Sequence, residues 1–210
     1  MDLKKVGQQY ERQELKRETL KESPIEQLEE WMQLAITAKI PYANAANLAT
    51  VGTDGFPKSR IILIKEIKDS SVVFFTNYNS AKAQDIAKNN KVSLNIYWKE
   101  LDRQVRITGT AKKSPVEESK EYFFSRPRES QISAIASDQS HIVEKEELYQ
   151  KVKELEKKFE GKDVEFPSFW GGYNVEIESI EFWQGRPNRL HDRFKYTKDG
   201  KSWVIQRLAP

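Results

Sequence analysis

The spacing of apolar residues changes at Pro41, and this change constrains the fold more than any other feature of the sequence. Before Pro41, the apolar residues Leu28, Trp31, Met32 and Ala35 recur at the spacing of one face of an α-helix. After it, short runs rich in β-branched and aromatic residues alternate with turn residues, a pattern typical of β-strands. The sequence therefore predicts a helix that is followed mainly by sheet.

The predicted helix has a clear beginning. Ser23 can cap its N-terminus, Pro24 suits the first helical position, and Glu26 stands where a capping box needs an acidic residue. The residues before Ser23 are polar and have no wide apolar stripe. We therefore expect residues 1–22 to form a mobile or loosely docked arm, and residues 23–210 to form a single domain.

The remaining segments show either the helical or the strand spacing of apolar residues, and no linker divides them into separate domains. The predicted strands cover residues 46–51, 59–67, 72–76, 92–98, 104–111, 173–183, 193–196 and 203–208, and a turn at 53–55 joins the first two. The predicted helices cover residues 80–89, 114–124, 130–136 and 144–159. Strands that come first, followed by helices and then by strands again, predict an α+β fold with an antiparallel sheet or small barrel.

The composition narrows the class of protein. The 5 Trp, 8 Tyr and 10 Phe residues are too many aromatic residues for a disordered chain, although 32% of the residues are charged. With no cysteine and only two histidines, we expect no disulfide and no metal site. The absence of a signal-peptide pattern and of a long apolar run predicts a cytoplasmic protein without a membrane partner. The 35 basic and 32 acidic residues are interleaved, which argues against binding to nucleic acid.

A basic segment near the C-terminus is the first candidate site. If it is extended, Arg189, His191 and Arg193 lie on one face, because alternate side chains of a strand share a face. Three hydrogen-bond donors on one face suit a bound anion. A solvated basic loop explains the same pattern equally well.

The second candidate lies where one predicted helix ends and the next begins. Tyr122 and Arg126 are four residues apart and become neighbours if the helix continues that far. Pro127 disfavours helix at Arg126, and Ser130 is placed to cap the following helix. A phenol, a guanidinium and a helix N-terminus at one corner can hold a phosphate. The alternative, which the pattern alone favours, is an ordinary corner with an exposed arginine.

Three further basic residues are candidates for binding an anion, and each also has an ordinary structural explanation. Lys82 falls in the first turn of a predicted helix with Ser80 as its N-cap, where a cation is unfavourable unless an anion is near. Arg60 and Lys65 end an apolar run and face opposite sides of an unbroken strand, where they would serve different ligand groups unless a bulge re-aims one of them. A surface lysine and solvent-facing strand ends are the ordinary explanations.

Four stretches of the chain resemble the pyridoxamine 5′-phosphate oxidase family. They are EFWQ at residues 181–184 with RLHDR at 189–193, SRPRESQI at 125–132, PSFWGG at 167–172, and RLAP at 207–210. The resemblance runs in order and without large gaps from about Ser23 to Pro210. Four motifs in register are much stronger support for the family than one motif would be.

This resemblance implies an FMN-binding split β-barrel with surrounding helices, and a homodimer that binds two FMN molecules across the subunit interface. The family's FMN contacts fall on Arg60, Ile61, Lys65, Phe75, Thr76, Lys82, Gln104, Gln139, Ser140, Trp183 and Arg193. The substrate contacts fall on Lys65, Tyr122, Arg126, Ser130, Arg189 and His191. The chain departs from the family pattern at Ala81, where an arginine is common, so one cation is missing from the implied phosphate site. Phe75 stands where the family often has tyrosine.

The resemblance also implies the activity, which is oxidation of pyridoxine 5′-phosphate and pyridoxamine 5′-phosphate to pyridoxal 5′-phosphate in vitamin B6 metabolism. In the family's chemistry, hydride passes from C4′ of the substrate to N5 of the flavin, and dioxygen reoxidises FMN to give hydrogen peroxide. The imine formed from the amine substrate is hydrolysed and releases ammonia. By the same resemblance, Arg189 and His191 are the catalytic side chains over the substrate ring, and the substrate phosphate binds Lys65, Tyr122, Arg126 and Ser130.

Two other functions remain open from the sequence. A split-barrel flavoprotein of another kind, such as a flavin reductase, would keep the FMN residues without the substrate residues, which this chain has in full. A protein that only sequesters pyridoxal 5′-phosphate would not need Gln104, Trp183 and Arg193, and would be colourless as purified.

Overall fold

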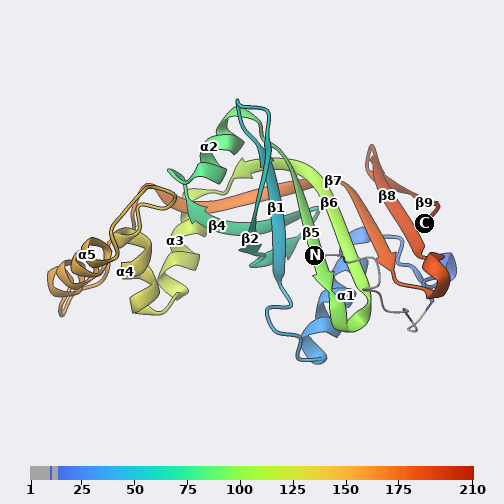
Figure 1. Ribbon diagram of the computed structural model, residues 1–210, viewed down its shortest axis with the longest axis horizontal. Helices are drawn as coiled ribbons and strands as arrows, with labels where there is room; N and C mark the ends of the chain where they lie inside the picture. The colour runs from blue at the N-terminus through green and yellow to red at the C-terminus, as the bar shows by residue number, and fades with distance from the viewer. Residues whose placement is uncertain (1–9, 11–13) are drawn as a thin grey trace, which may run out of the picture.

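A computed structural model describes residue 10 and residues 14–210 of the chain. Within these residues, nine strands form one curled antiparallel sheet with five α-helices around it (Figure 1). The strands are β1 (Ala45–Val51), β2 (Pro57–Leu63), β3 (Glu66–Lys68), β4 (Ser71–Asn77), β5 (Lys91–Trp98), β6 (Arg103–Lys113), β7 (Trp170–Gln184), β8 (Asp192–Asp199) and β9 (Ser202–Arg207). The helices are α1 (Pro24–Thr37), α2 (Ala81–Lys88), α3 (Val116–Ser125), α4 (Arg128–Ala136) and α5 (Lys145–Lys158). The predicted antiparallel α+β fold is confirmed.

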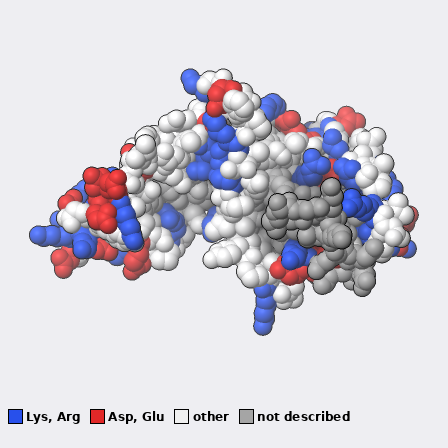
Figure 2. Space-filling model, viewed as in Figure 1, with Lys and Arg blue, Asp and Glu red and all other residues white. Residues whose placement is uncertain are grey.

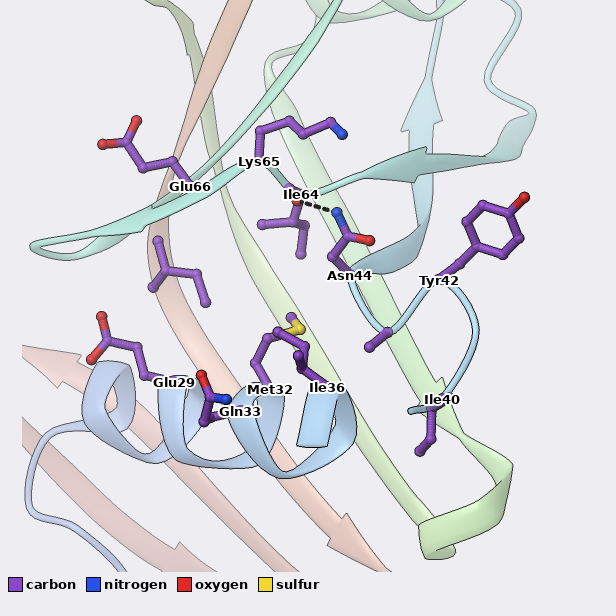
Figure 3. Close-up of a pocket in the computed structure, with 12 residues that line it drawn as sticks. Glu29, Met32, Gln33, Ile36, Ile40, Tyr42, Asn44, Ile64, Lys65 and Glu66 are labelled. Atoms are coloured by element: carbon purple, nitrogen blue, oxygen red, sulfur yellow. Dashed lines mark hydrogen bonds between the residues drawn. The ribbon is translucent and has the colours of Figure 1, made fainter. Parts of the chain in front are cut away.

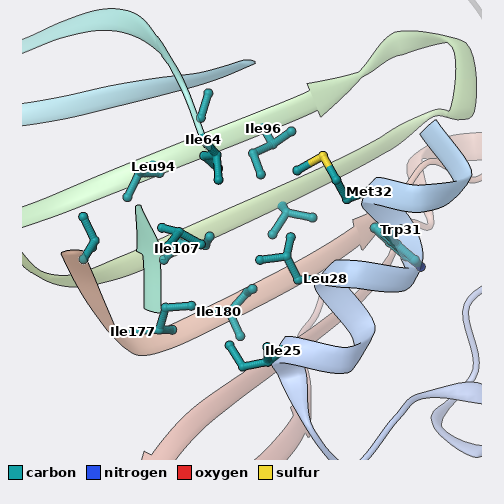
Figure 4. Packing of buried hydrophobic residues seen from close by; sticks show 14 of the residues in the cluster. Ile25, Leu28, Trp31, Met32, Ile64, Leu94, Ile96, Ile107, Ile177 and Ile180 are labelled. Carbon is teal, nitrogen blue, oxygen red and sulfur yellow. The ribbon is translucent and has the colours of Figure 1, made fainter. Parts of the chain in front are cut away.

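The first helix begins where its sequence predicts. The Ser23 hydroxyl accepts a hydrogen bond from the Glu26 backbone amide, and Pro24 occupies the first helical position. Leu28 and Trp31 on its inner face are fully buried. They pack against the isoleucine-rich inner side of β5, β6 and β7, so α1 covers the inside of the curled sheet (Figure 4).

Strand β7 organises the sheet. It is 15 residues long and pairs with β6 along most of its length, with β4 through residues 170–176, and with β8 through residues 179–184. The pairing with β6 shifts between Thr108 and Gly109, and a Cβ atom at Gly109 would collide with the carbonyl oxygen of Glu176. Glycine is therefore required where the two strands approach most closely.

The predicted strand at 59–67 is wrong in one respect, because it is interrupted. β2 ends at Leu63, and the chain then changes partner: the Ile64 amide donates to Asn44 O, whereas the Lys65 amide donates to Val73 O on β4. The Asn44 side chain also donates to Ile64 O, at 2.8 Å. This change of partner from β1 to β4 curls the sheet, so Arg60 and Lys65 do not share an unbroken strand.

The two ends of the sheet carry different attachments. Helices α3, α4 and α5 form a lobe at one end, held by a second apolar cluster around Phe123, Ile132 and Trp170 (Figure 1). At the other end, residues 14–22 lie against β8, where the Leu15 amide donates to Asp192 and the Tyr196 hydroxyl donates to Lys21 O. The rest of the predicted arm, residues 1–9 and 11–13, lies outside the described residues, and its mobility stays a prediction. No helix in the described part of the chain is long and apolar enough to cross a membrane.

Candidate active site

A cavity of about 590 Å³ opens between the end of β2, β4, the start of α2, and helices α3 and α4. Nine of the residues expected at the site line it: Ile61, Lys65, Phe75, Thr76, Lys82, Tyr122, Arg126, Ser130 and Gln139. They come from segments far apart in the sequence, and the curl of the sheet and the helical lobe bring them together. The expected FMN set and the expected substrate set thus meet in one hollow.

Lys82 makes one end of this cavity strongly cationic. Only 7% of Lys82 is exposed, and its ammonium donates to Thr76 Oγ1 and Ser80 Oγ, each at 3.1 Å. No carboxylate among the described residues forms an ion pair with it. Burial and the nearby Arg60 guanidinium lower the pKa of Lys82 to about 8. A buried ammonium beside a second cation is stabilised by a bound anion.

The Ser80 hydroxyl does not cap α2, contrary to its predicted role, because it accepts from Lys82 instead. Ser140 takes over this contact from 59 residues away, and its Oγ accepts from the Ala81 amide at 3.2 Å. Gln139 next to it accepts from Thr76 Oγ1 at 3.0 Å. The loop after α4 is thereby fixed against the start of α2, and both expected polar contacts lie beside Lys82.

Arg126 forms the other cationic end. Helix α3 ends at Ser125 because Pro127 holds Arg126 extended, and the guanidinium lies 4.9 Å from the Trp170 ring. The rings of Phe75, Tyr122 and Trp170 are nearly parallel and contact one another, with Phe75 4.0 Å from Tyr122 and 5.5 Å from Trp170, so these aromatic rings fix the wall beside Arg126. Arg126 Nη1 is buried and has no hydrogen-bond partner. An unpaired buried donor in a cavity wall is costly unless a ligand accepts its hydrogen bond.

Ser130 lies at this end too, but not as the predicted cap. Helix α4 begins at Arg128 with Pro127 at its N-cap position, so Ser130 is the third helical residue. The proline supplies the turn into the helix, and the Ser130 side chain faces the cavity instead. Lys65 completes this end with its ammonium 5.9 Å from the Tyr122 ring.

A second group of expected residues lies elsewhere, at the far end of β7. Gln104, Trp183 and Arg193 are direct cross-strand neighbours on β6, β7 and β8. His191 lies 4.7 Å from Trp183, and its Nδ1 accepts from the Arg186 amide at 3.1 Å. Burial, followed by the charges of Arg189 and Arg193, lowers the pKa of His191. The ring is therefore neutral at pH 7 and carries its proton on Nε2.

The prediction that Arg189, His191 and Arg193 share one face of an extended segment is wrong. Residues 187–189 form a short 3₁₀ turn in which Asn188 and Arg189 have φ values of 56° and 62°. This left-handed turn exposes Arg189 and breaks the alternation. Arg193 is instead fixed in β8 by Glu181 Oε1, at 2.8 Å, and by Ala209 O, at 2.7 Å.

Sequence reasoning missed Tyr10 in this second group. Its ring lies edge-on to Trp183, at 5.5 Å, and to His191, at 5.4 Å. A single aromatic residue in a polar N-terminal segment is the only signal that could have pointed to it.

The two groups do not meet within one chain. Trp170 lines the cavity and Trp183 belongs to the second group, and both lie on β7. At roughly 3.3 Å per residue, 13 residues of strand separate them by about 40 Å along the chain. One chain therefore carries two separate groups of expected residues, one at each end of β7.

A larger hollow of about 750 Å³ lies on the other side of Lys65, between α1 and β3 (Figure 3). Its walls are mostly apolar, with Met32, Ile36 and Ile40 among them, and its charged groups are Lys65, Glu29 and Glu66. One cation against two carboxylates does not suit a phosphate.

The charged residues on the surface are unevenly distributed. Lys and Arg gather beside α2 below the β1–β2 turn, whereas basic and acidic residues are intermixed over α5 (Figure 2).

Comparison with known proteins shows which family the chain resembles. The family described as pyridoxamine 5′-phosphate oxidase matches residues 32–159, and the pyridoxine 5′-phosphate oxidase C-terminal dimerisation region matches residues 170–210. The chain is 47% identical to the pyridoxine/pyridoxamine 5′-phosphate oxidases of Vibrio cholerae serotype O1 (strain M66-2), over 211 residues, and of Crocosphaera subtropica (strain ATCC 51142 / BH68), over 214. Both alignments cover 100% of this chain and of the relative.

Solved structures show the same fold. PhzG from Burkholderia lata 383, crystallised with tetrahydrophenazine-1-carboxylic acid, is 31% identical and superposes with a TM-score of 0.87, covering 92% of this chain and 95% of that one. A pyridoxamine 5′-phosphate oxidase-related FMN-binding protein from Nostoc punctiforme PCC 73102 is 14% identical, with a TM-score of 0.72 over 90% of this chain and 98% of that one. The predicted split β-barrel is confirmed. With both family regions matched in order and relatives aligned from end to end, the chain belongs to the pyridoxamine 5′-phosphate oxidase family.

Proposed function

We propose that the protein uses FMN and dioxygen to oxidise pyridoxine 5′-phosphate and pyridoxamine 5′-phosphate to pyridoxal 5′-phosphate. One structural observation supports this proposal independently of what the relatives are called. The cavity has an unpaired buried cation at each end: Lys82, which has no carboxylate partner among the described residues, and Arg126, which has an unpaired N–H. Two phosphorylated compounds that react with each other need two anion sites in one hollow.

The residues at the Lys82 end fit the phosphate of FMN. A phosphate monoester carries close to two negative charges at pH 7, which the Lys82 ammonium and the nearby Arg60 guanidinium would balance. Thr76, Gln139 and Ser140 add polar groups beside it. When bound there, FMN would supply a two-electron acceptor that dioxygen can reoxidise.

The Arg126 end fits the phosphate of the substrate. Arg126 can donate its free N–H, and the Tyr122 and Ser130 hydroxyls and the Lys65 ammonium line the same wall. Charge-assisted hydrogen bonds of this kind fix both position and orientation. These side chains would hold the pyridine ring between the two ends of the cavity.

The second half-site points to a second copy of the chain. The family region described as a dimerisation region covers residues 170–210, which include Trp183, Arg189, His191 and Arg193. We propose that FMN binds between two copies, so that this half-site of one copy closes the cavity of the other. Neutral His191 then offers its Nε2 proton to the substrate, and Arg189, on its exposed turn, orients the reacting carbon.

An anaerobic titration of FMN-loaded protein with pyridoxine 5′-phosphate tests the proposal. We expect the visible flavin absorbance to bleach and to recover when air is admitted. Pyridoxine, which lacks the phosphate, serves as the matched control and should bleach the flavin only at much higher concentration. An unchanged spectrum with the phosphate ester would make a flavoprotein with another substrate the better assignment.

A cytoplasmic location, expected from the sequence, stays a prediction.

A further inference from the structure

Asp85 on α2 lies at the centre of a buried polar cluster behind the Lys82 end of the cavity. Only 7% of this residue is exposed. Its carboxylate accepts from Thr50 Oγ1 at 2.8 Å and from Lys58 Nζ at 3.4 Å, and it lies 3.9 Å from Arg60 Nη2. The cluster joins α2 to strands β1 and β2.

The hydroxyl of Thr50 links Asp85 to Arg60. A hydroxyl has one proton, and Thr50 donates it to Asp85, so its lone pairs are left to accept from Arg60 Nη1 at 2.7 Å. An acceptor-only carboxylate at position 85 therefore sets the direction of the hydroxyl. Arg60 Nη1 also donates to the carbonyls of Leu48 and Lys58, and Nη2 lies 3.9 Å from Asp85, so protein groups hold the guanidinium at both of these nitrogens.

The same helix carries Lys82, three residues before Asp85, so the two side chains lie on neighbouring positions of α2. Asp85 thus ties the helix that carries Lys82 to the strand that carries Arg60. Gly52 leaves the space for this contact, because a Cβ atom there would collide with the Asp85 carboxylate. The Gly52 backbone does not lie in the left-handed region, so only the space constrains it.

We propose that Asp85 is a positioning residue for the phosphate of FMN, acting through Thr50 on Arg60. This inference rests on the proposed function, because it takes the Lys82 end of the cavity as the FMN phosphate site. None of the expected family contacts includes Asp85, Thr50 or Gly52. The carboxylate does not touch the phosphate; it fixes the cation that does.

The test compares two flavins on the full-length chain freed of flavin. Asp85→Asn removes the charge that directs the Thr50 hydroxyl, Thr50→Val removes the hydroxyl that joins Asp85 to Arg60, and Gly52→Ala displaces the carboxylate without changing any charge. We expect each variant to weaken FMN binding about fivefold to tenfold, as for the loss of one ordinary hydrogen bond. Riboflavin, which has no phosphate, should keep its affinity within about twofold. Quenching of flavin fluorescence measures both.

Asp54→Asn is the matched control, because Asp54 also pairs with Lys58, at 2.9 Å, but is exposed and has no contact with Arg60. It should bind both flavins as the unchanged chain does. The inference is overturned if Asp85→Asn and Thr50→Val bind FMN normally or more tightly, or if FMN and riboflavin weaken together. If the unchanged chain binds neither flavin, the proposed function fails and the inference falls with it.

Discussion

At the scale of single residues, Lys82 shows most clearly how burial and charge conflict at this site. Its pKa of about 8 means that the ammonium is mostly protonated at pH 7 and mostly neutral at pH 9 in the protein without ligand. A phosphate dianion binds the protonated form. We therefore expect FMN affinity to fall as pH rises through 8, by up to about tenfold per pH unit.

Fluorescence titrations at pH 7.0, 8.0 and 9.5 measure this dependence. Lys82→Met is the matched variant, because it keeps much of the side-chain volume and removes the titrating group. It should bind FMN weakly and with a flat profile over the same range. A flat profile in the unchanged chain would contradict the role given to Lys82.

Arg126 has a buried N–H without a partner, so its removal costs little in the free protein and much in the complex. We expect Arg126→Ala to raise KM for pyridoxine 5′-phosphate by about 30-fold or more, the equivalent of one charge-assisted hydrogen bond. FMN content should not change. Steady-state kinetics with a flavin assay separates the two effects.

Arg128→Ala is the control for Arg126, because Arg128 donates to the carbonyls of Phe159 and Lys162 outside the cavity. Its KM should stay near that of the unchanged chain. Equal losses in the two variants would mean that Arg126 acts through the stability of the helical lobe.

Arg189 is exposed on a left-handed turn and contributes nothing to the core. We expect Arg189→Ala to fold normally, to keep its FMN, and to lose at least about 30-fold in kcat/KM, as for the loss of an oriented charged contact at the reacting carbon. Stopped-flow reduction of the bound flavin measures the step itself. A change in kcat/KM of only a few-fold would remove Arg189 from the catalytic residues.

At the scale of secondary-structure elements, several predictions from local sequence were right, but the expected caps at Ser80 and Ser130 were wrong and a change of partner strand was not foreseen. The cap at Ser23 and the strand of residues 92–98 follow from local pattern. The interruption after Leu63 does not, because it arises from a change of partner strand that involves Asn44 and Val73. The turn at Asn188 and Arg189 was missed for a similar reason, since neither residue signals a positive φ as glycine does.

Gly109 tests how tightly β6 and β7 approach. We expect Gly109→Ala to lower the free energy of unfolding by about 1–3 kcal/mol, because the added methyl group meets a backbone carbonyl that cannot rotate away. Thr108→Ala, the neighbouring control, loses only its contact with Ser179 and should cost less than about 1 kcal/mol. Urea unfolding gives both values, and equal values would show that the strands can move apart.

At the scale of the whole molecule, the sequence indicated candidate site residues without revealing that they lie in two groups at different ends of β7. The spacing of residues along the chain does not show near which end of β7 a residue lies in the folded protein. The expectation of a homodimer came from family resemblance, and the dimerisation region agrees with it. The separation of Trp170 from Trp183 along β7 supports the proposal that a second copy completes the site.

Mixed dimers test this arrangement directly. Arg126→Ala and Arg189→Ala damage different half-sites, so a dimer that contains one chain of each has one doubly damaged site and one intact site. When the two impaired variants are unfolded and refolded together, we expect kcat/KM to return to about a quarter of normal, since half of the randomly formed dimers are mixed and one of the two sites in each of these is intact. No recovery would place both residues in a site built from one chain.

The position of β7 in the sequence has a consequence for how the chain acquires its structure. This strand pairs with β4, about 100 residues earlier, so it leaves the ribosome long after β4 does. Until then the edges of β4 and β6 that face β7 have no partner, and contacts between such distant segments form slowly. During this part of its synthesis the nascent chain has exposed strand edges, which is when chaperones protect a protein from aggregation. A ribosome that stops before residue 170 releases a chain that cannot complete its sheet.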